Sequence, residues 1–272
     1  MIGPDTTRAA HRLAGGAALG LLTLALAASV GCRNLDDFHW KKMNFEVFRD
    51  PENPMEVIRS SKDGNERARA LRCLQEPLTH GGTQQDQDAV VAVLNYSASH
   101  ESQLWCRLAA IDSLRKFKDP RAADGMKEAY YHAGIFNPEQ ATVIRCQALT
   151  GLGETRQPAA VEVLVRVLRE PPVEGPDQDK ELKMRERIAA AKALRGYPDQ
   201  QATGALVEVL RREKDDALRN NAHESLVAST GKRLPPDGQV WADYFENPSK
   251  VDPSLVQQPN LGERILELTG LK

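Results

Sequence analysis

Residues 145–152 read Arg-Cys-Gln-Ala-Leu-Thr-Gly-Leu, and the spacing of Arg145, Ala148 and Leu152 within this stretch decides the fold. Steps of three and four residues place these three side chains on one face of an α-helix. The same Arg-x-x-Ala-x-x-x-Leu pattern occurs five times in the chain, which indicates an internal repeat. Its copies are Arg67/Ala70/Leu74, Arg107/Ala110/Leu114, Arg145/Ala148/Leu152, Arg187/Ala190/Leu194 and Arg219/Ala222/Leu226.

A second apolar pattern follows each of the first four motif copies after a short turn. Ala160, Leu164 and Leu168, for example, lie 8, 12 and 16 residues beyond Leu152. This spacing predicts a second amphipathic helix for each copy. After the first copy the pattern comes eight residues late, and Gly81-Gly82-Thr83 predicts a loop insertion there. Two helices in each unit of roughly 40 residues predict an all-α fold, an α-solenoid of about five helix pairs.

Helix start signals stand between the apolar patterns. Asn137-Pro138 places a capping residue directly before a proline, which is a favoured first helical residue. Asp177 and Asp215 predict the starts of the fourth and fifth motif helices. The predicted boundaries therefore agree with the repeat.

These repeats resemble HEAT repeats, particularly the bacterial type that includes the HEAT-like repeats of bilin lyases. Asp215, Arg219 and Ala222 carry the resemblance best, and it covers roughly residues 53–231. The resemblance implies an α-solenoid in which the motif arginines bridge neighbouring repeats by bonding carbonyls or acids at the turns. The residues expected in this structural role are Arg67, Arg107, Arg145, Arg187 and Arg219.

Residues 1–31 have the organisation of an export signal. A basic start precedes an uncharged apolar run over residues 13–28, which is shorter than a typical membrane-spanning helix. The run leads into Val30-Gly31-Cys32, which resembles the lipobox of bacterial lipoproteins. That resemblance implies removal of residues 1–31 and lipidation of Cys32. Ordinary secretion, with Ala25-Leu26-Ala27 as the cleavage site, and an uncleaved anchor are the alternatives.

The segments on either side of the repeats are expected to cover the ends of the array. Residues 32–52 are interpreted as an anchor-proximal tether and N-terminal cap, because they contain four aromatic residues. Contact of these rings with the membrane interface is the alternative. Residues 232–246 are expected to form a C-terminal capping helix. Residues 247–272 form a tail, with a short helix predicted near residues 261–268.

The sequence offers few candidates for chemistry. Ser113-x-x-Lys116 matches a nucleophile pattern of penicillin-binding enzymes, but the companion motifs are missing. His100-Glu101 and His223-Glu224 resemble the His-Glu pairs of the HEAT-repeat enzyme deoxyhypusine hydroxylase, but they stand at the wrong places in the repeat. No catalytic residue, metal ligand or cofactor is therefore predicted.

The cysteines are also expected to have structural roles. Cys73, Cys106 and Cys146 lie beside motif residues on predicted helices, which favours buried thiols. A disulfide between Cys106 and Cys146, which lie beside equivalent arginines, is the alternative.

Charge composition bears on the kind of partner. The chain has 272 residues with 36 Lys and Arg and 38 Asp and Glu, a net charge of −2 that argues against nucleic-acid binding. The surface positions five residues after each motif arginine carry mixed charges, which suits a polypeptide better than a phosphate backbone. These positions hold Arg72, Asp112, Thr150, Lys192 and Glu224.

The sequence as a whole predicts a non-enzymatic protein-binding scaffold. It would be lipid-anchored in the bacterial cell envelope, outside the cytoplasm, with one or more protein partners and a membrane contact through its N-terminal lipid. A cell-wall or glycan-binding lipoprotein is one alternative. A cofactor-handling protein of the bilin-lyase kind is the other.

Overall fold

The computed structural model describes residues 53–252 and residue 255. All regular structure in this part of the chain is helical, which confirms the predicted all-α fold. The predicted export signal, Cys32, the segment 32–52 and the helix expected near residues 261–268 lie outside the described residues. None of the described helices has the length and apolar character needed to cross a membrane.

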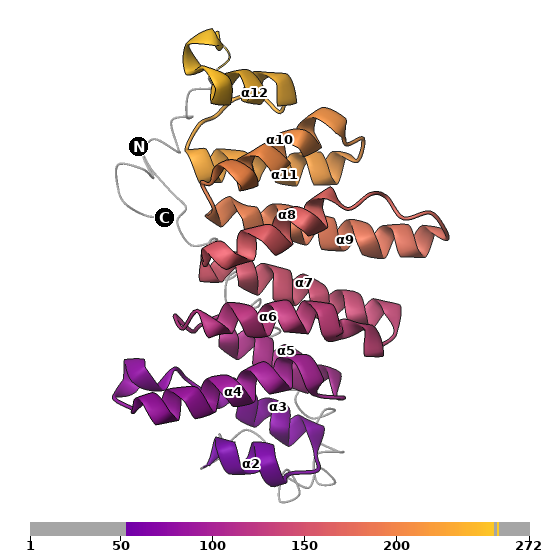
Figure 1. The fold of residues 1–272 in the computed structure, drawn as a ribbon. Helices are drawn as coiled ribbons and strands as arrows, with labels where there is room; N and C mark the ends of the chain where they lie inside the picture. The colour runs from indigo at the N-terminus through magenta and orange to yellow at the C-terminus, as the bar shows by residue number, and fades with distance from the viewer. Residues whose placement is uncertain (1–52, 253–254, 256–272) are drawn as a thin grey trace, which may run out of the picture. The chain divides into compact units, whose positions relative to one another are not determined.

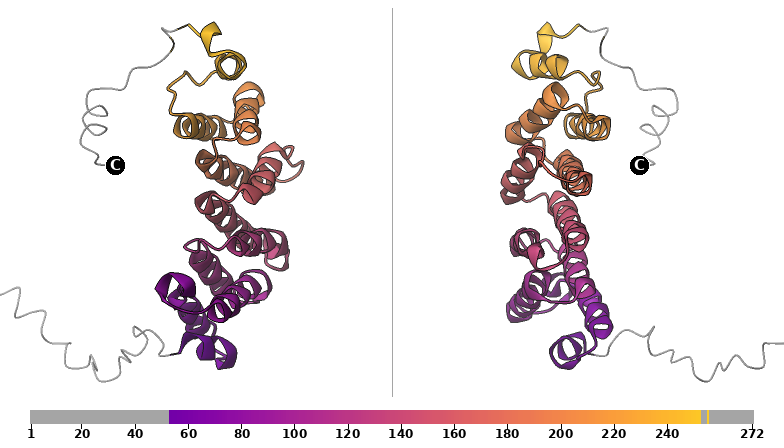
Figure 2. Two further views of the ribbon diagram at one scale, coloured as in Figure 1. Left: turned by 60° about the vertical axis from the view of Figure 1, so that its left-hand side comes forward. Right: turned by 90° about the vertical axis from the view of Figure 1, so that its right-hand side faces the viewer.

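The helices lie in two rows (Figures 1 and 2). One row holds the helices that carry the motif, and each of them packs directly against the next. These motif-row helices are α3 (Gly64–Cys73), α5 (Leu104–Leu114), α7 (Pro138–Thr155), α9 (Asp177–Ala193) and α11 (Asp216–Thr230). The partner-row helices are α4 (Gln84–His100), α6 (Arg121–Tyr131), α8 (Val161–Arg169) and α10 (Gln200–Arg212).

Each partner-row helix forms a hairpin with the motif helix that follows it. Thus α4 packs on α5, α6 on α7, α8 on α9 and α10 on α11, each more closely than a motif helix packs on the partner helix after it. Within the partner row, α4 and α6 also pack closely on each other. The spacing in the sequence predicts that each motif helix pairs with the helix after it, and this prediction is wrong. A periodic apolar pattern fixes the alternation of the two helix types, but it does not say which neighbour closes the hairpin. The first hairpin is completed by α2 (Pro54–Ser60), which packs on the core through the partly buried Met55 and Ile58. A helix of seven residues is too short to show the extended apolar period of the longer helices.

The motif alanines and leucines form the core between the rows. All five alanines are fully buried, and four of the five leucines are fully buried as well. Small residues let the helices approach closely. At Gly151 on α7, a Cβ atom would lie 2.3 Å from Sδ of Met126 on α6. The Ala and Gly content of the sequence is thus a packing requirement of this array.

The predicted helix starts are placed as expected. The side chain of Asn137 accepts from the backbone N–H of Gln140 at the start of α7. Asp215 caps α11 in the same way, and Asp177 is the first residue of α9. The predicted insertion after α3 contains a 3-10 turn, η4 (Pro77–His80), and ends at Thr83, which forms a capping box with Asp86.

A short helix, α12 (Gly238–Glu246), follows the last repeat and packs on α10. Asp237 caps its start by accepting from the backbone N–H groups of Gln239 and Val240. Trp241 is fully buried, and its indole N–H donates to the carbonyl of Pro235 at 3.0 Å. The helix therefore continues the partner row and covers its end. A 3-10 turn, η8 (Pro248–Lys250), follows it.

Candidate functional site

Three of the five motif arginines bind the turn that precedes their own helix. Arg67, Arg107 and Arg219 each stand fourth in a helix, and each donates to the carbonyl six residues upstream. Those carbonyls belong to Ser61, Glu101 and Glu213, with N–O distances of 3.1, 2.7 and 3.3 Å. From the fourth position of the helix, the guanidinium extends back past the first helical residue and reaches the turn that precedes the helix.

The same three arginines also reach the following turn of the array. Arg67 binds both carboxylate oxygens of Glu101 at 3.2 and 3.1 Å. Arg107 donates to the carbonyl of His132 at 2.9 Å, and Arg219 donates to that of Pro236 at 3.4 Å. Each guanidinium therefore connects two consecutive turns, and its planar set of donors suits this geometry.

Arg107 is the most buried of the five, with 1% of its surface exposed. Its guanidinium carbon lies 5.1 Å from the ring centroid of Phe136. Both hydrogen bonds of Arg107 go to neutral carbonyls, and burial lowers the pKa of its guanidinium. A buried cation held this way depends on its geometry, because a lost donor leaves a carbonyl unpaired.

Arg187 stands deeper in a longer helix, so its contacts differ. The carbonyl six residues upstream lies inside α9, and Arg187 instead donates to the carbonyl of Leu168 at the end of α8, at 3.2 Å. Its other contact is an ion pair with Glu213 at 2.8 Å, in the turn after α10. Two turns are again connected, through a different carbonyl.

Arg145 departs furthest from the expected role. It binds Glu186 at 3.1 Å, and this carboxylate lies on the neighbouring helix α9 and not in a turn. The Arg145 side chain is 31% exposed, whereas that of Glu186 is 3% exposed and is also paired with Lys183. The helix start lies seven residues before Arg145, so its guanidinium does not reach the turn as Arg107 does.

Buried groups beside this pair have shifted acidities. Burial, followed by the charge of Glu186, raises the pKa of the Tyr130 hydroxyl. Burial also raises the pKa of the Cys146 thiol to about 11. A thiol with so high a pKa is almost entirely protonated at neutral pH, which makes it a poor nucleophile.

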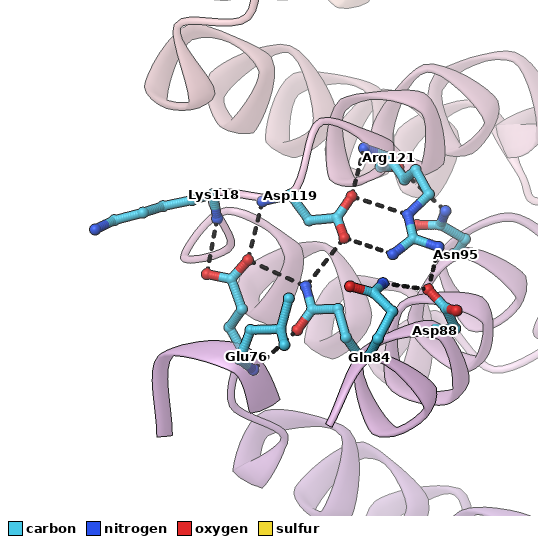
Figure 3. Close-up of polar contacts among 9 residues, drawn as sticks. Glu76, Gln84, Asp88, Asn95, Lys118, Asp119 and Arg121 are labelled. Atoms are coloured by element: carbon cyan, nitrogen blue, oxygen red, sulfur yellow. Dashed lines mark hydrogen bonds and ion pairs between the residues drawn. The ribbon is translucent and has the colours of Figure 1, made fainter. Parts of the chain in front are cut away.

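The loop insertion carries a polar network of its own (Figure 3). Glu76 is 8% exposed, and its carboxylate accepts from the backbone N–H groups of Lys118 and Asp119 at 3.0 and 2.9 Å. Gln87 on α4 donates to Glu76 at 3.2 Å and to Asp119 at 3.0 Å. The buried carboxylate therefore fastens the insertion to the loop between α5 and α6.

Arg121 completes this network at the surface (Figure 3). It binds Asp119 through Nε at 2.9 Å and Nη2 at 2.6 Å, and it binds Asp88 through Nη1 at 2.7 Å. Hydrogen bonding to Arg121 holds the pKa of Asp119 far below its ordinary value. Each carboxylate of this network accepts hydrogen bonds from other members of it, so the network is a structural clamp.

The residues singled out for chemistry have structural surroundings. Ser113 is fully buried and donates to the carbonyl of Leu71 at 2.7 Å. His223 Nε2 lies 2.7 Å from the carbonyl oxygen of Leu234. Cys106 and Cys146 are free thiols, so the disulfide considered between them is not formed. Within residues 53–252 and 255, no three His, Cys, Asp or Glu side chains are grouped closely enough to hold a metal ion.

The exposed surface of the partner row carries a stack of aromatic rings, which we call the aromatic ridge: Tyr96, His100 and His132. Tyr96 and His100 on α4 stack at 4.9 Å between centroids, and His100 stacks on His132 at 5.5 Å. Tyr96 is 65% exposed, and the His132 side chain is 51% exposed. Tyr131 beside it, 47% exposed, accepts a hydrogen bond from Arg166 on α8 at 3.0 Å.

The aromatic ridge was missed in the sequence, because its rings come from two helices that are distant along the chain. Of its three residues, only His100 belongs to a motif recognised in the sequence, the pair His100-Glu101. Its neighbour Glu101 is engaged with Arg67, while the His100 ring lies in the stack. Exposed rings in contact over neighbouring repeats are typical of surfaces that bind other molecules.

Comparison with known proteins supports the repeat assignment. No curated protein matches the chain. Residues 144–170, which comprise the second part of α7, the turn after it and α8, match the family model of the PBS lyase HEAT-like repeat. This match and the repeated hairpins around it support the assignment of the chain as a HEAT-like repeat protein.

Proposed function

We propose that the protein is a non-enzymatic, protein-binding scaffold, anchored by a lipid on Cys32 outside the cytoplasm. The aromatic ridge is the observation that carries this proposal. Tyr96, His100 and His132 form an exposed aromatic strip over two successive hairpins, and the packed array beneath holds the strip in place. Aromatic side chains supply large contact area at little cost in conformational entropy, so they are enriched in protein interfaces.

The charged groups of the repeats support the same proposal. Arg67, Arg107, Arg187 and Arg219 are engaged in holding turns together, and the Glu76 network is satisfied internally. A partner would therefore find a preformed surface, and it would bind without rearranging the array. Preformed surfaces bind with a smaller loss of conformational freedom.

Photo-cross-linking in intact cells tests the proposal. A photoreactive phenylalanine analogue placed at Tyr96 is expected to join the protein to one dominant partner. The same analogue at Ala217, an exposed residue of α11 on the motif row, is the matched control. The partner identified at Tyr96 should also bind the purified wild-type protein, and Tyr96→Ala should weaken that binding. Identical adducts at both positions would contradict a specific surface.

Exposed rings also favour the glycan-binding alternative, since sugars stack on aromatic faces. Trp105 on α5 is 58% exposed and Tyr96 is 65% exposed. Co-sedimentation with purified peptidoglycan that is lost in Tyr96→Ala would favour this alternative. The family name of the matched repeat suggests cofactor handling, which a visible absorption band in the purified protein would support.

A further inference from the structure

A pocket of about 430 Å³ lies where the C-terminal ends of α7 and α9 meet. Its floor is made of small residues, because the two helix ends approach closely there. A Cβ atom on Gly153 would lie 2.7 Å from Cα of Ala193, and one on Gly196 would lie 3.0 Å from the carbonyl oxygen of Gly153. Longer side chains from both helix ends stand around this floor.

Three of those longer side chains are cationic: Arg156, Lys192 and Arg195. All three are exposed, and none forms a hydrogen bond or ion pair through its side chain with another residue of the described chain. Most of the arginines described above are paired with an acid or a carbonyl. The carboxylate at the rim, Glu154, is already held by Arg115 through two bonds of 2.6 and 2.5 Å. The pocket therefore has an excess of positive charge.

The backbone of Arg156 supplies a second observation. Its φ is +52°, and it is the one non-glycine residue with a positive φ in the part of the chain that the structure describes. A left-handed residue after a helix is usually glycine, because a side chain is disfavoured in that conformation. Here the position holds an arginine, whose side chain lies beside Gly196 at the pocket. A strained residue kept at a pocket is typical of functional sites.

The helix dipole stabilises positive charge at a helix C-terminus, and this accounts for a cation near the C-terminal end of α7 or of α9. It does not account for three unpaired cations around a single cavity, where their mutual repulsion opposes the arrangement. An anion in the cavity would relieve that repulsion. A dianion balances the three cations and the remaining charges of the rim better than a single carboxylate does.

We propose that this pocket binds a phosphate group, with Arg156, Lys192 and Arg195 as its ligands. The volume exceeds that of one phosphate, so the group would belong to a small phosphorylated molecule or to an anionic phospholipid headgroup. Arginine forks bind phosphate oxygens in pairs, and lysine adds a mobile point charge. This site is independent of the aromatic ridge and of the scaffold function.

Calorimetric titration of the full-length protein with inorganic phosphate and pyrophosphate, at constant ionic strength, tests the site. Arg156→Gly removes one cation and relaxes the backbone, since glycine accepts a positive φ. Lys192→Gln and Arg195→Gln remove the others at exposed positions. Lys62→Gln, which removes an exposed cation between α2 and α3, is the matched control. Each pocket variant is expected to weaken pyrophosphate binding about tenfold, and the control should not.

Vesicles separate the two sources of phosphate. Phosphatidylcholine vesicles are compared with an equal mixture of phosphatidylcholine and phosphatidylglycerol. Binding to the mixed vesicles that is lost in the pocket variants, without binding of free pyrophosphate, assigns the site to a lipid headgroup. Binding of pyrophosphate alone assigns it to a soluble ligand. The proposal is overturned if neither probe binds, or if the pocket variants and Lys62→Gln bind alike.

Discussion

Replacing Arg107 by alanine should destabilise the array more than any other single change to a motif arginine. The side chain is 1% exposed, and it joins the carbonyls of Glu101 and His132 in successive turns. Arg107→Ala leaves both acceptors without their donor and removes the group that lies over Phe136. At about 1–3 kcal/mol for each lost hydrogen bond to the charged guanidinium, and with the desolvation of the cation relieved, the expected loss is about 2–5 kcal/mol.

The loss of stability expected for Arg107→Ala is to be compared with that of Arg145→Ala. Arg145 is 31% exposed and makes one bond to Glu186, which keeps Lys183 as a partner after the substitution. We expect a loss of about 1 kcal/mol or less from Arg145→Ala. Arg107→Lys should recover only part of the stability, because one ammonium cannot reproduce a planar fork directed at two turns.

Urea unfolding followed by far-UV circular dichroism measures these differences. Hydrogen exchange should place the damage of Arg107→Ala in the turns after α4 and α6, because a repeat array depends on contacts between neighbours. A loss below about 1 kcal/mol for Arg107→Ala, or a loss equal to that of Arg145→Ala, would refute the reasoning.

Three further predictions concern the anchor, the core and the clamp. Cys32→Ser should release the protein from membranes or leave it unprocessed, and fractionation with wild-type mobility would argue against lipidation. Leu152→Ala, at a fully buried position, should cost about 2–5 kcal/mol in a urea titration, and a cost below about 1 kcal/mol would contradict the packing. Arg121 depresses the pKa of Asp119, so the stabilisation by this carboxylate is present at neutral pH and is lost as pH falls below about 4. The stability difference between wild type and Asp119→Asn should therefore shrink in acid, and a difference independent of pH would contradict this assignment.

The repeat could be predicted from sequence because it is a local property. Arg145, Ala148 and Leu152 share one helix face, and five copies in register leave little room for chance. The same reasoning could not assign hairpins, since α2 has only seven residues and packs on the core through the partly buried Met55 and Ile58 alone, which is too short a pattern to recognise. The contacts of each arginine depend on its distance from the helix start, which the motif alone does not contain.

The two candidate binding surfaces, the aromatic ridge and the α7–α9 pocket, could not be predicted from local sequence patterns. The rings of His100 and His132 meet only because α4 and α6, which ends directly before His132, are neighbours in the partner row. The cations of the α7–α9 pocket are similar in this respect, because Arg156 and Arg195 stand in turns outside the motif. Such groupings follow from the packing of helices that are distant in sequence.

Each hairpin consists of a partner-row helix followed by a motif-row helix. This pair is therefore the unit that a gene duplication would add to the array. Duplication of residues 84–114 would add α4 and α5, a complete hairpin with its own buried seam. Duplication of residues 104–131 would add α5 and α6, which belong to different hairpins. The one new junction would then lie inside a hairpin, where α6 meets a second copy of α5 in place of α7, for which its apolar face is shaped. Recombination at the turns before the partner helices is therefore expected to disturb the packing least when the array changes length.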